Sequence, residues 1–319
     1  FNIFLSTQDL MNKYQKNVFF IAVLDKDGKS SSSGTGFILS KKDSMEQNVY
    51  YLITCKHVVS FWKFKNHKIE NGKTFDEQNK EIDPTFYIAA WPYNSPVLDP
   101  NTRTYLFENS FNNLPDSSKR RGYIELVKIA DDSFEDLGNN LRKHLQKSND
   151  DIAIFKLLQE KEEEKEESKD EEKELKDKEG KEGNKESKDK DTKDKENKES
   201  KDKKLVKKTR LEISYQQWNI TSKKRFGAGE SVIVLGYPLG ASRLLDKNGL
   251  AIPVVSEGKI VSECETPNFL EINANQNQGA SGGPVVNEKG EIVGMVTFSD
   301  QDKKLIYCIQ ASIIQESMK

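Results

Sequence analysis

The sequence predicts an all-β fold built from two groups of strands that a long charged insert separates. Short runs of β-branched and aromatic residues recur along the chain, and turn formers such as Asp27-Gly28 and Pro115-Asp116 lie between them. Few segments have the apolar spacing of an amphipathic helix. About a dozen short strands with few helices are typical of a β-sandwich or a pair of β-barrels.

The apolar runs give the expected order of elements. Before the insert, strands are expected at residues 18–24, 36–39, 49–54, 85–91, 103–107, 123–129 and 151–157, and a short helix at residues 134–146. After the insert, strands are expected at residues 231–237, 252–261, 269–273, 291–298 and 305–310, and a terminal helix at residues 312–318. The two groups of strands are of similar size, so each could form one β domain.

The insert, residues 160–204, is far richer in charged residues than the rest of the chain. It contains 20 acidic residues, 16 lysines and a single aliphatic side chain, Leu175, so it cannot build a core. We expect a solvated helix over residues 160–179, supported by Glu–Lys pairs four residues apart, and disorder over residues 180–204. The predicted domains are residues 1–158, the insert at 159–204 and residues 205–319.

The composition excludes several classes of protein. The formal net charge of the chain is −2, and neither half has the cationic surplus of a nucleic-acid-binding protein. No apolar run reaches the roughly 18 residues that span a bilayer. Because the chain begins at Phe1 without a methionine, we expect a fragment or a processed product in which no signal peptide can be recognised.

The cysteines and histidines do not predict a metal centre. Cys55, Cys264 and Cys308 are too few and too scattered for a disulfide framework. We expect free buried thiols that act as small apolar residues, with one disulfide as the alternative. The three histidines form no HExxH pattern, so the prediction is no metal and no cofactor.

Three local patterns carry groups that suit acyl transfer. His57 ends the run Leu52-Ile53-Thr54-Cys55-Lys56-His57, Asp151 precedes an apolar strand, and Ser281 lies in Gln278-Gly279-Ala280-Ser281-Gly282-Gly283-Pro284. A serine hydroxyl needs an imidazole to take its proton, and a buried aspartate fixes the imidazole's tautomer. The backbone N–H groups of Gly279 and Ser281 would stabilise the oxyanion. Taken singly, each pattern also fits a structural role, as a histidine at a strand end, a turn aspartate or a flexible turn.

These patterns resemble the trypsin-like serine peptidases of the chymotrypsin fold and are most similar to the HtrA-type catalytic domain. Four further segments carry the resemblance, at residues 34–37, 235–240, 257–262 and 287–294. The resemblance covers nearly all of residues 231–310, but only 34–59 and 150–157 of the first half. The family acid directly precedes an Ile-Ala pair, which favours Asp151 over the competing Asp150.

The resemblance implies two antiparallel six-stranded β-barrels with the active site between them. It also implies hydrolysis of protein or peptide substrates through an acyl-enzyme, without a cofactor, and an extracytoplasmic or secreted location. His57 and Asp151 are 94 positions apart, which predicts an insertion within residues 61–121. No Ile-Val-Gly-Gly-like start and no PDZ-like module occur, so neither trypsin-style zymogen activation nor peptide sensing by a PDZ domain is expected.

The resemblance also assigns the walls of the S1 pocket. They would come from Asn275 and Gln276, just before the serine, and from the strand through Val296, Thr297 and Phe298. Asn275 stands six positions before Ser281, where an acid selects lysine or arginine in trypsin. An uncharged pocket narrowed by Phe298 predicts small or medium uncharged P1 residues.

Two other functions fit parts of the pattern. A catalytically idle binding or adhesin-like module could use the same scaffold, although such modules usually lack one of the three reactive groups. An esterase of the α/β-hydrolase class would need its serine on a strand–turn–helix. Ser281 is followed by Gly-Gly-Pro and a predicted strand, which argues against the esterase.

Deletion of residues 160–204 with a short Gly/Ser bridge should leave the melting temperature almost unchanged. The segment has one aliphatic residue to bury, and lengthening a loop costs only about 0.6 kcal/mol per doubling. Differential scanning calorimetry of both forms measures this. A large fall in melting temperature would mean that the segment packs against the rest of the chain.

Overall fold

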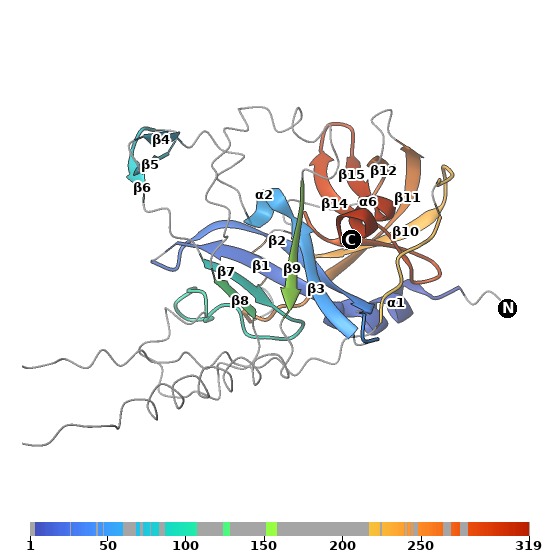
Figure 1. Ribbon diagram of the computed structural model, residues 1–319, viewed down its shortest axis with the longest axis horizontal. Helices are drawn as coiled ribbons and strands as arrows, with labels where there is room; N and C mark the ends of the chain where they lie inside the picture. Colours follow the sequence, from blue (N-terminus) through green and yellow to red (C-terminus); the bar gives the residue numbers. More distant parts are fainter. Residues whose placement is uncertain are drawn as a thin grey trace, which may run out of the picture. The chain divides into compact units, whose positions relative to one another are not determined.

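The computed structural model describes residues 4–25, 27–42, 44–46, 48–59, 68–70, 73–76, 78–82, 87–106, 124–127, 151–157, 217–223, 225–238, 240, 242, 244, 248–263, 269–274 and 280–318 (Figure 1). All of them belong to one unit, made of residues 1–157 and 211–319. The charged insert and the helix expected at residues 134–146 lie outside the described residues, and their structures stay predictions.

The first half of the chain forms a six-stranded antiparallel sheet in the order β8-β7-β1-β2-β3-β9. Its strands are β1 (Val18–Leu24), β2 (Ser30–Lys42), β3 (Asn48–Cys55), β7 (Tyr87–Trp91), β8 (Ile124–Val127) and β9 (Ile152–Leu157). Every residue of β1 is buried, which agrees with its uninterrupted apolar sequence and its position inside the sheet.

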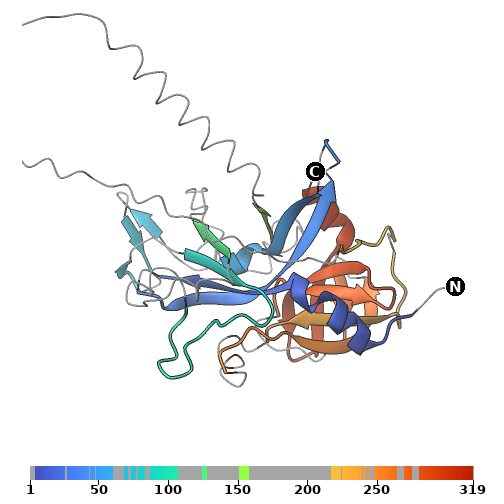
Figure 2. The ribbon, with the colours of Figure 1, turned by 90° about the horizontal axis from the view of Figure 1, so that it is seen from below.

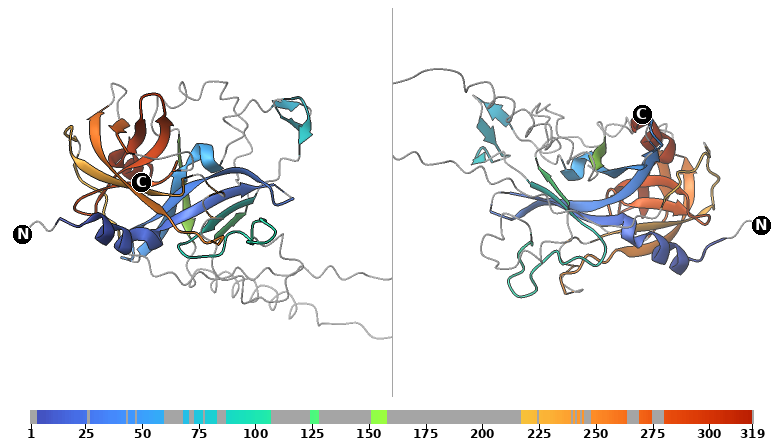
Figure 3. Two further views of the ribbon diagram at one scale, coloured as in Figure 1. Left: turned by 180° about the vertical axis from the view of Figure 1, so that it is seen from behind. Right: turned by 60° about the horizontal axis from the view of Figure 1, so that its bottom comes forward.

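The second half forms a closed antiparallel barrel of six strands, in the order β10-β11-β12-β15-β14-β13. The strands are β10 (Ser231–Gly236), β11 (Val254–Glu263), β12 (Phe269–Ile272), β13 (Pro284–Asn287), β14 (Ile292–Asp300) and β15 (Leu305–Gln310). The helix α6 (Ala311–Ser317) follows β15 directly (Figure 3). Closure leaves this domain without an unpaired sheet edge.

The expected fold class is confirmed in its coarser form, a mostly β protein with one closed six-stranded barrel and a second antiparallel sheet. A second closed barrel was also expected. Among the described residues, β8 and β9 are the two ends of the first sheet, and no pairing joins them. Residues 107–123 and 128–150, which flank β8, lie outside the described part of the chain.

Most expected strands are present. The prediction of a strand at residues 103–107 is wrong for residues 103–106, which are the ones that the structure describes. Residues 103–106 take part only in an isolated bridge between Leu98 and Tyr105. The carboxylate of Asp99 accepts the backbone N–H groups of Asn101 and Thr102, and Arg103 has a φ of 59°. This side-chain-capped turn replaces the extended backbone that a strand needs.

Several short elements were not expected from the sequence. They are the N-terminal helix α1 (Thr7–Tyr14) with the short turn η1 (Gln15–Asn17), the one-turn helix α2 (Lys56–Val59), and a small sheet of β4 (Lys68–Glu70), β5 (Lys73–Phe75) and β6 (Glu81–Ile82). The small sheet lies within residues 61–121, where an insertion was predicted. Helix α1 had a readable signal, because Ser6 and Asp9 form a capping box.

Helix α1 packs on the barrel (Figure 2). The ring of Tyr14 stacks on Trp218 with 4.4 Å between ring centroids, and the Trp218 indole N–H donates to the carbonyl oxygen of Gly290 at 3.0 Å. The backbone N–H of Leu5 donates to the carbonyl oxygen of Glu288. These contacts hold the start of the chain against the turn between β13 and β14.

One continuous hydrophobic core joins the first sheet to the barrel. Tyr237, which follows β10, is fully buried, and its hydroxyl donates to the carbonyl oxygen of Val18 at 3.2 Å. Its backbone N–H donates to the hydroxyl of Thr35, and the backbone N–H of Thr35 donates to the carbonyl oxygen of Ser281 at 2.8 Å. Strand β2 is therefore fixed to two segments of the second half.

Gly282 is a position where the two halves approach very closely. Its φ is 86°, and a Cβ atom there would lie 1.9 Å from the carbonyl oxygen of Thr35 and 2.5 Å from the hydroxyl of Thr54. Both groups are themselves hydrogen-bonded, since Thr54 donates to the Thr35 carbonyl at 2.7 Å. Only glycine fits this backbone conformation in this space.

Replacing Gly282 with alanine should destabilise the protein more than the matched variant Gly229→Ala. Gly229 has a φ of 89°, but no atom lies within 4 Å of the position that a Cβ would take, so it carries only the cost of left-handed backbone, roughly 1–2 kcal/mol. Gly282→Ala adds a clash with β2, and overpacking typically costs about 1–3 kcal/mol more. Urea unfolding of both variants measures the difference, and equal losses would contradict the close approach.

Candidate active site

His57 is held by a single turn of helix at the end of β3. Strand β3 ends at Cys55, and α2 follows without a loop. Val58 and Val59 are buried, and they anchor this turn in the core. The His57 side chain is 21% exposed, so its ring lies at the boundary between the core and solvent.

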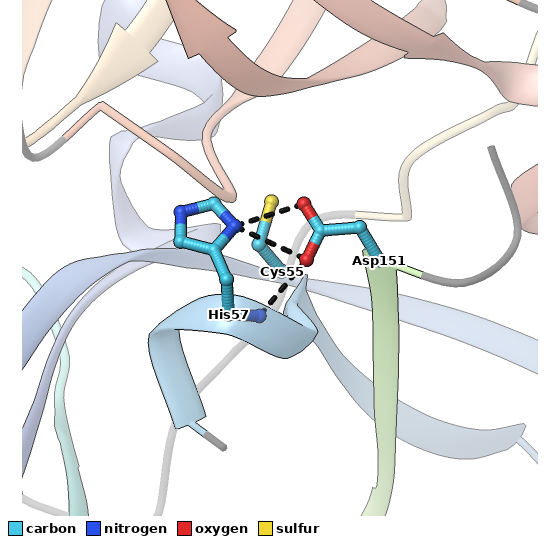
Figure 4. A group of neighbouring side chains, drawn as sticks. All are labelled: Cys55, His57 and Asp151. Carbon is cyan, nitrogen blue, oxygen red and sulfur yellow. Dashed lines mark hydrogen bonds and ion pairs between the residues drawn. The ribbon is translucent and has the colours of Figure 1, made fainter. Parts of the chain in front are cut away.

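Asp151 immediately precedes β9, and strand pairing brings it to His57. Strands β3 and β9 are antiparallel, with Cys55 opposite Ile152, so the residue before β9 meets the residues after β3. Nδ1 of His57 lies 2.9 Å from Oδ2 of Asp151 and 3.1 Å from Oδ1 (Figure 4). The backbone N–H of His57 also donates to Oδ1 at 2.9 Å.

The His57–Asp151 pair favours its charged form. Burial alone would raise the pKa of the Asp151 carboxyl, but the charge of His57 and the hydrogen bonds from His57 and Thr297 lower that pKa below its ordinary value. Burial alone would lower the pKa of His57, whereas the charge and hydrogen bond of Asp151 raise it above its ordinary value. The carboxylate is fully buried, so it has little competition from solvent.

Thr297 connects the aspartate to the serine. Its side chain is fully buried, and its hydroxyl donates to Oδ2 of Asp151 at 2.5 Å. Its carbonyl oxygen accepts the hydroxyl of Ser281 at 3.0 Å. The resemblance assigned Thr297 to the substrate pocket, but in the structure its side chain faces the carboxylate.

Ser281 lies in a tight turn at the start of β13, and its side chain is half-buried. The backbone N–H of Gly282 donates to the carbonyl oxygen of Val296 at 2.8 Å, and that of Gly283 donates to the carbonyl oxygen of Ala280 at 2.8 Å. With the bond from Thr35 to Ser281, this turn is attached to both β14 and β2. The structure thus links Ser281, Thr297, Asp151 and His57 through consecutive hydrogen bonds.

Four residues assigned from the sequence lie outside the described residues. They are Asp150, Asn275, Gln276 and Gly279. Of the pocket residues that are described, Phe298 is half-buried, and its ring stacks on Tyr307 with 4.4 Å between centroids. It also meets the edge of Phe269 at 6.4 Å. These contacts fix the orientation of the Phe298 ring.

Cys55 is a neighbour of the site to which the sequence assigned no part in the chemistry. It was expected to be a free buried thiol, and both Cys55 and Cys308 are free and buried, while Cys264 is outside the described residues. The Cys55 thiol donates to the carbonyl oxygen of Val296 at 3.1 Å and lies beside the Asp151 carboxylate (Figure 4). Its position two residues before His57 was the available signal, but only the β3–β9 pairing brings Asp151 next to it.

Comparisons with known proteins find similarity over the part of the chain that holds Ser281. The family described as the trypsin-like peptidase domain matches residues 213–295. A protein of Staphylococcus haemolyticus named serine protease HtrA-like is 34% identical over 100 residues, which cover 29% of this chain and 16% of that protein. A putative serine protease of Synechocystis, HhoB, is 37% identical over 83 residues, or 24% of this chain and 19% of HhoB. The chain therefore spans less than a fifth of the length of each relative in these matches.

Two solved structures are similar over most of the chain. The serine endoprotease from Yersinia pestis has a TM-score of 0.44 at 14% identity, over 99% of this chain and 66% of that one. Deg5 has a TM-score of 0.46 at 12% identity, over 97% of this chain and 90% of that one.

The matched segment begins before the barrel and extends through the Ser281 turn into β14. Residues 213–295 are thus similar to the trypsin-like peptidase domain. Both relatives are named as serine proteases, and one of them as HtrA-like. Among the described residues, no helix is long and apolar enough to cross a bilayer.

The imidazole of His57 should titrate above the ordinary histidine pKa of about 6.5, because the buried carboxylate stabilises the imidazolium. In Asp151→Asn that charge is absent while burial remains, so the midpoint should fall below that of the wild type. Nuclear magnetic resonance of the ring across pH measures both midpoints. A wild-type midpoint below 6.5 would mean that burial outweighs the carboxylate.

Proposed function

We propose that this protein is a serine endopeptidase that hydrolyses peptide bonds with Ser281 as nucleophile, His57 as general base and Asp151 as the orienting acid. The contact between Nδ1 of His57 and the fully buried Asp151 carboxylate is the observation that carries the proposal. The similarity of residues 213–295, which include Ser281, to the trypsin-like peptidase domain supports the same assignment. Protein or peptide is the substrate class that the names of the relatives suggest.

The contact determines which nitrogen of His57 acts as the base. Because Nδ1–H donates to Asp151, the lone pair of the neutral ring is on Nε2. In the structure the Ser281 hydroxyl donates to the carbonyl oxygen of Thr297. For attack, the hydroxyl turns from that carbonyl to Nε2, which takes its proton as Oγ bonds to the substrate carbonyl carbon.

The tetrahedral intermediate then needs stabilisation of its oxyanion. We assign this to the backbone N–H groups of Gly279 and Ser281, as the resemblance implies. The left-handed φ of 86° at Gly282 bends the chain directly after Ser281. His57 next donates its proton to the leaving amine, which leaves the acyl group on Ser281. Water, deprotonated by the same nitrogen, hydrolyses this acyl-enzyme and restores the serine.

Thr297 gives Asp151 its orientation in this scheme. A carboxylate in a buried site is costly unless its lone pairs are satisfied. Asp151 accepts from the backbone N–H and the ring of His57 and from the Thr297 hydroxyl. These donors keep the carboxylate charged and prevent rotation, so it remains directed at Nδ1.

We further infer that the first sheet is the N-terminal barrel of a chymotrypsin-type pair. Six antiparallel strands, with the histidine after β3 and the aspartate before β9, support this reading. A catalytically idle binding module on the same scaffold is the alternative, and the reactivity of Ser281 distinguishes the two.

Ser281 should react with a fluorophosphonate probe, which labels activated serine hydroxyls. Labelling should disappear in Ser281→Ala and persist in the matched variant Ser317→Ala, whose exposed hydroxyl bonds to the carbonyl of Ile313 on α6.

His57→Ala, Asp151→Asn and Ser281→Ala should each lower peptide turnover by factors on the order of 10⁴ to 10⁶. These losses should not add in the double and triple variants, because the three residues act as one unit. Folded wild-type protein that never reacts would favour the idle module, and normal turnover in Asp151→Asn with loss in Asp150→Asn would move the acid to Asp150.

Peptide libraries should reveal a preference for small or medium uncharged P1 residues such as alanine, valine, serine or threonine. The proposed pocket has neutral walls at Asn275 and Gln276, which cannot compensate for the desolvation of a lysine or arginine. Phe298→Ala should shift preference toward leucine, methionine or phenylalanine by roughly 10- to 200-fold at most. Cleavage dominated by P1 arginine, lysine or glutamate would contradict this pocket while leaving the catalytic assignment intact.

A further inference from the structure

Cys55 is a buried thiol beside the catalytic pair that the proposed hydrolysis does not use. Its side chain is fully buried at the end of β3, and burial, followed by the negative charge of Asp151, raises the pKa of the thiol well above its ordinary value. Its Sγ, a ring nitrogen of His57 and a carboxylate oxygen of Asp151 all lie within 4.8 Å of one another, and the ring nitrogen that faces Asp151 is Nδ1. Figure 4 shows the three groups directed at one another from β3, α2 and the start of β9.

The three groups are a donor set that zinc favours. Thiolate sulfur, imidazole nitrogen and carboxylate oxygen bind Zn²⁺ at about 2.3, 2.0 and 2.0–2.2 Å respectively. Tetrahedral bonds of these lengths put the sulfur about 3.5 Å from the nitrogen. The observed spacing of at most 4.8 Å therefore needs only a modest shift of these side chains. Three protein ligands leave a fourth position for water, as in open zinc sites.

We propose that Cys55, His57 and Asp151 form a binding site for a thiophilic divalent cation of the zinc type. The ion would enter past the His57 ring, since that side chain is 21% exposed and the other two are fully buried. Binding releases the thiol proton to solvent. It also requires the lone pair of Nδ1, so neutral His57 must carry its proton on Nε2.

The bound ion would therefore oppose the proposed chemistry. Nε2–H cannot accept a proton from Ser281, and Asp151 is engaged by the metal instead of by Nδ1–H. This consequence rests on the proposed function, whereas the binding site itself does not. The inference assigns the site an inhibitory role, because the metal fixes the inactive tautomer of the base.

Binding is tested first without any activity measurement. Titration of the folded protein with Cd²⁺ should produce an ultraviolet thiolate-to-metal charge-transfer band that saturates at one ion per chain, and Zn²⁺ should displace it. The band should be absent in Cys55→Ala and present in the matched variant Cys308→Ala, whose thiol is also buried but lies on β15. A band that survives Cys55→Ala, or no band in the wild type, would overturn the site.

Inhibition is tested second. Fluorophosphonate labelling and peptide turnover are measured in each variant with and without Zn²⁺, and the ratio of the two values gives the inhibition. The wild type and Cys308→Ala should be inhibited and should recover on chelation. Cys55→Ala should need at least about tenfold more Zn²⁺, because loss of even an outer-shell partner of a metal costs 10–100-fold in affinity. Cys55→Ser keeps the size of the side chain but not the sulfur, so it should behave like Cys55→Ala. It serves as a second test variant in case Cys55→Ala does not fold.

The two tests separate the two proposals. The first outcome is a Cys55-dependent Cd²⁺ band in a protein that neither reacts with the probe nor cleaves peptides. It would support the metal site and contradict the proposed peptidase function. The second outcome is a protein that reacts with the probe and cleaves peptides, and that Zn²⁺ inhibits equally in the wild type and in Cys55→Ala. It would contradict the metal site and support the proposed peptidase function.

Discussion

The buried carboxylate of Asp151 imposes the central constraint on this structure. A charge without exposure to solvent is tolerated only when donors satisfy it, and here they come from the backbone and ring of His57 and from the hydroxyl of Thr297. These donors lie on α2 and β14, which belong to different halves of the chain. Satisfying one carboxylate thus requires the sheet and the barrel to be correctly packed.

The Ser281 turn meets a steric constraint at the same junction. The carbonyl oxygen of Ser281 accepts the backbone N–H of Thr35, and Gly282 leaves no space for a side chain against that same residue. The serine is therefore fixed from β2, while its hydroxyl contacts Thr297. In the proposed hydrolysis, this fixed backbone would pre-organise Ser281 as the nucleophile.

Because Cys55 lies close to this carboxylate, the site combines groups for proton transfer with a ligand for metal ions. The same geometry that suits a histidine–aspartate pair brings a soft sulfur ligand within 4.8 Å of both groups. The proposed hydrolysis needs a proton on Nδ1 of His57, whereas metal binding needs the lone pair of that atom. Cys55, at the end of β3, would therefore make a hydrolytic centre sensitive to thiophilic cations.

The sequence alone determined the mostly β class and most strand positions, and it predicted His57, Asp151 and Ser281 as the reactive residues, because alternation, turn chemistry and local motifs are encoded within short segments. Helices α1 and α2 were missed, the latter because a single turn gives too short a pattern. The closed barrel, the strand order of the first sheet and the positions of Thr297 and Cys55 beside Asp151 were decided by tertiary structure. Strand pairing between β3 and β9, and the approach of β14, join residues up to 241 positions apart, and no local pattern specifies such contacts.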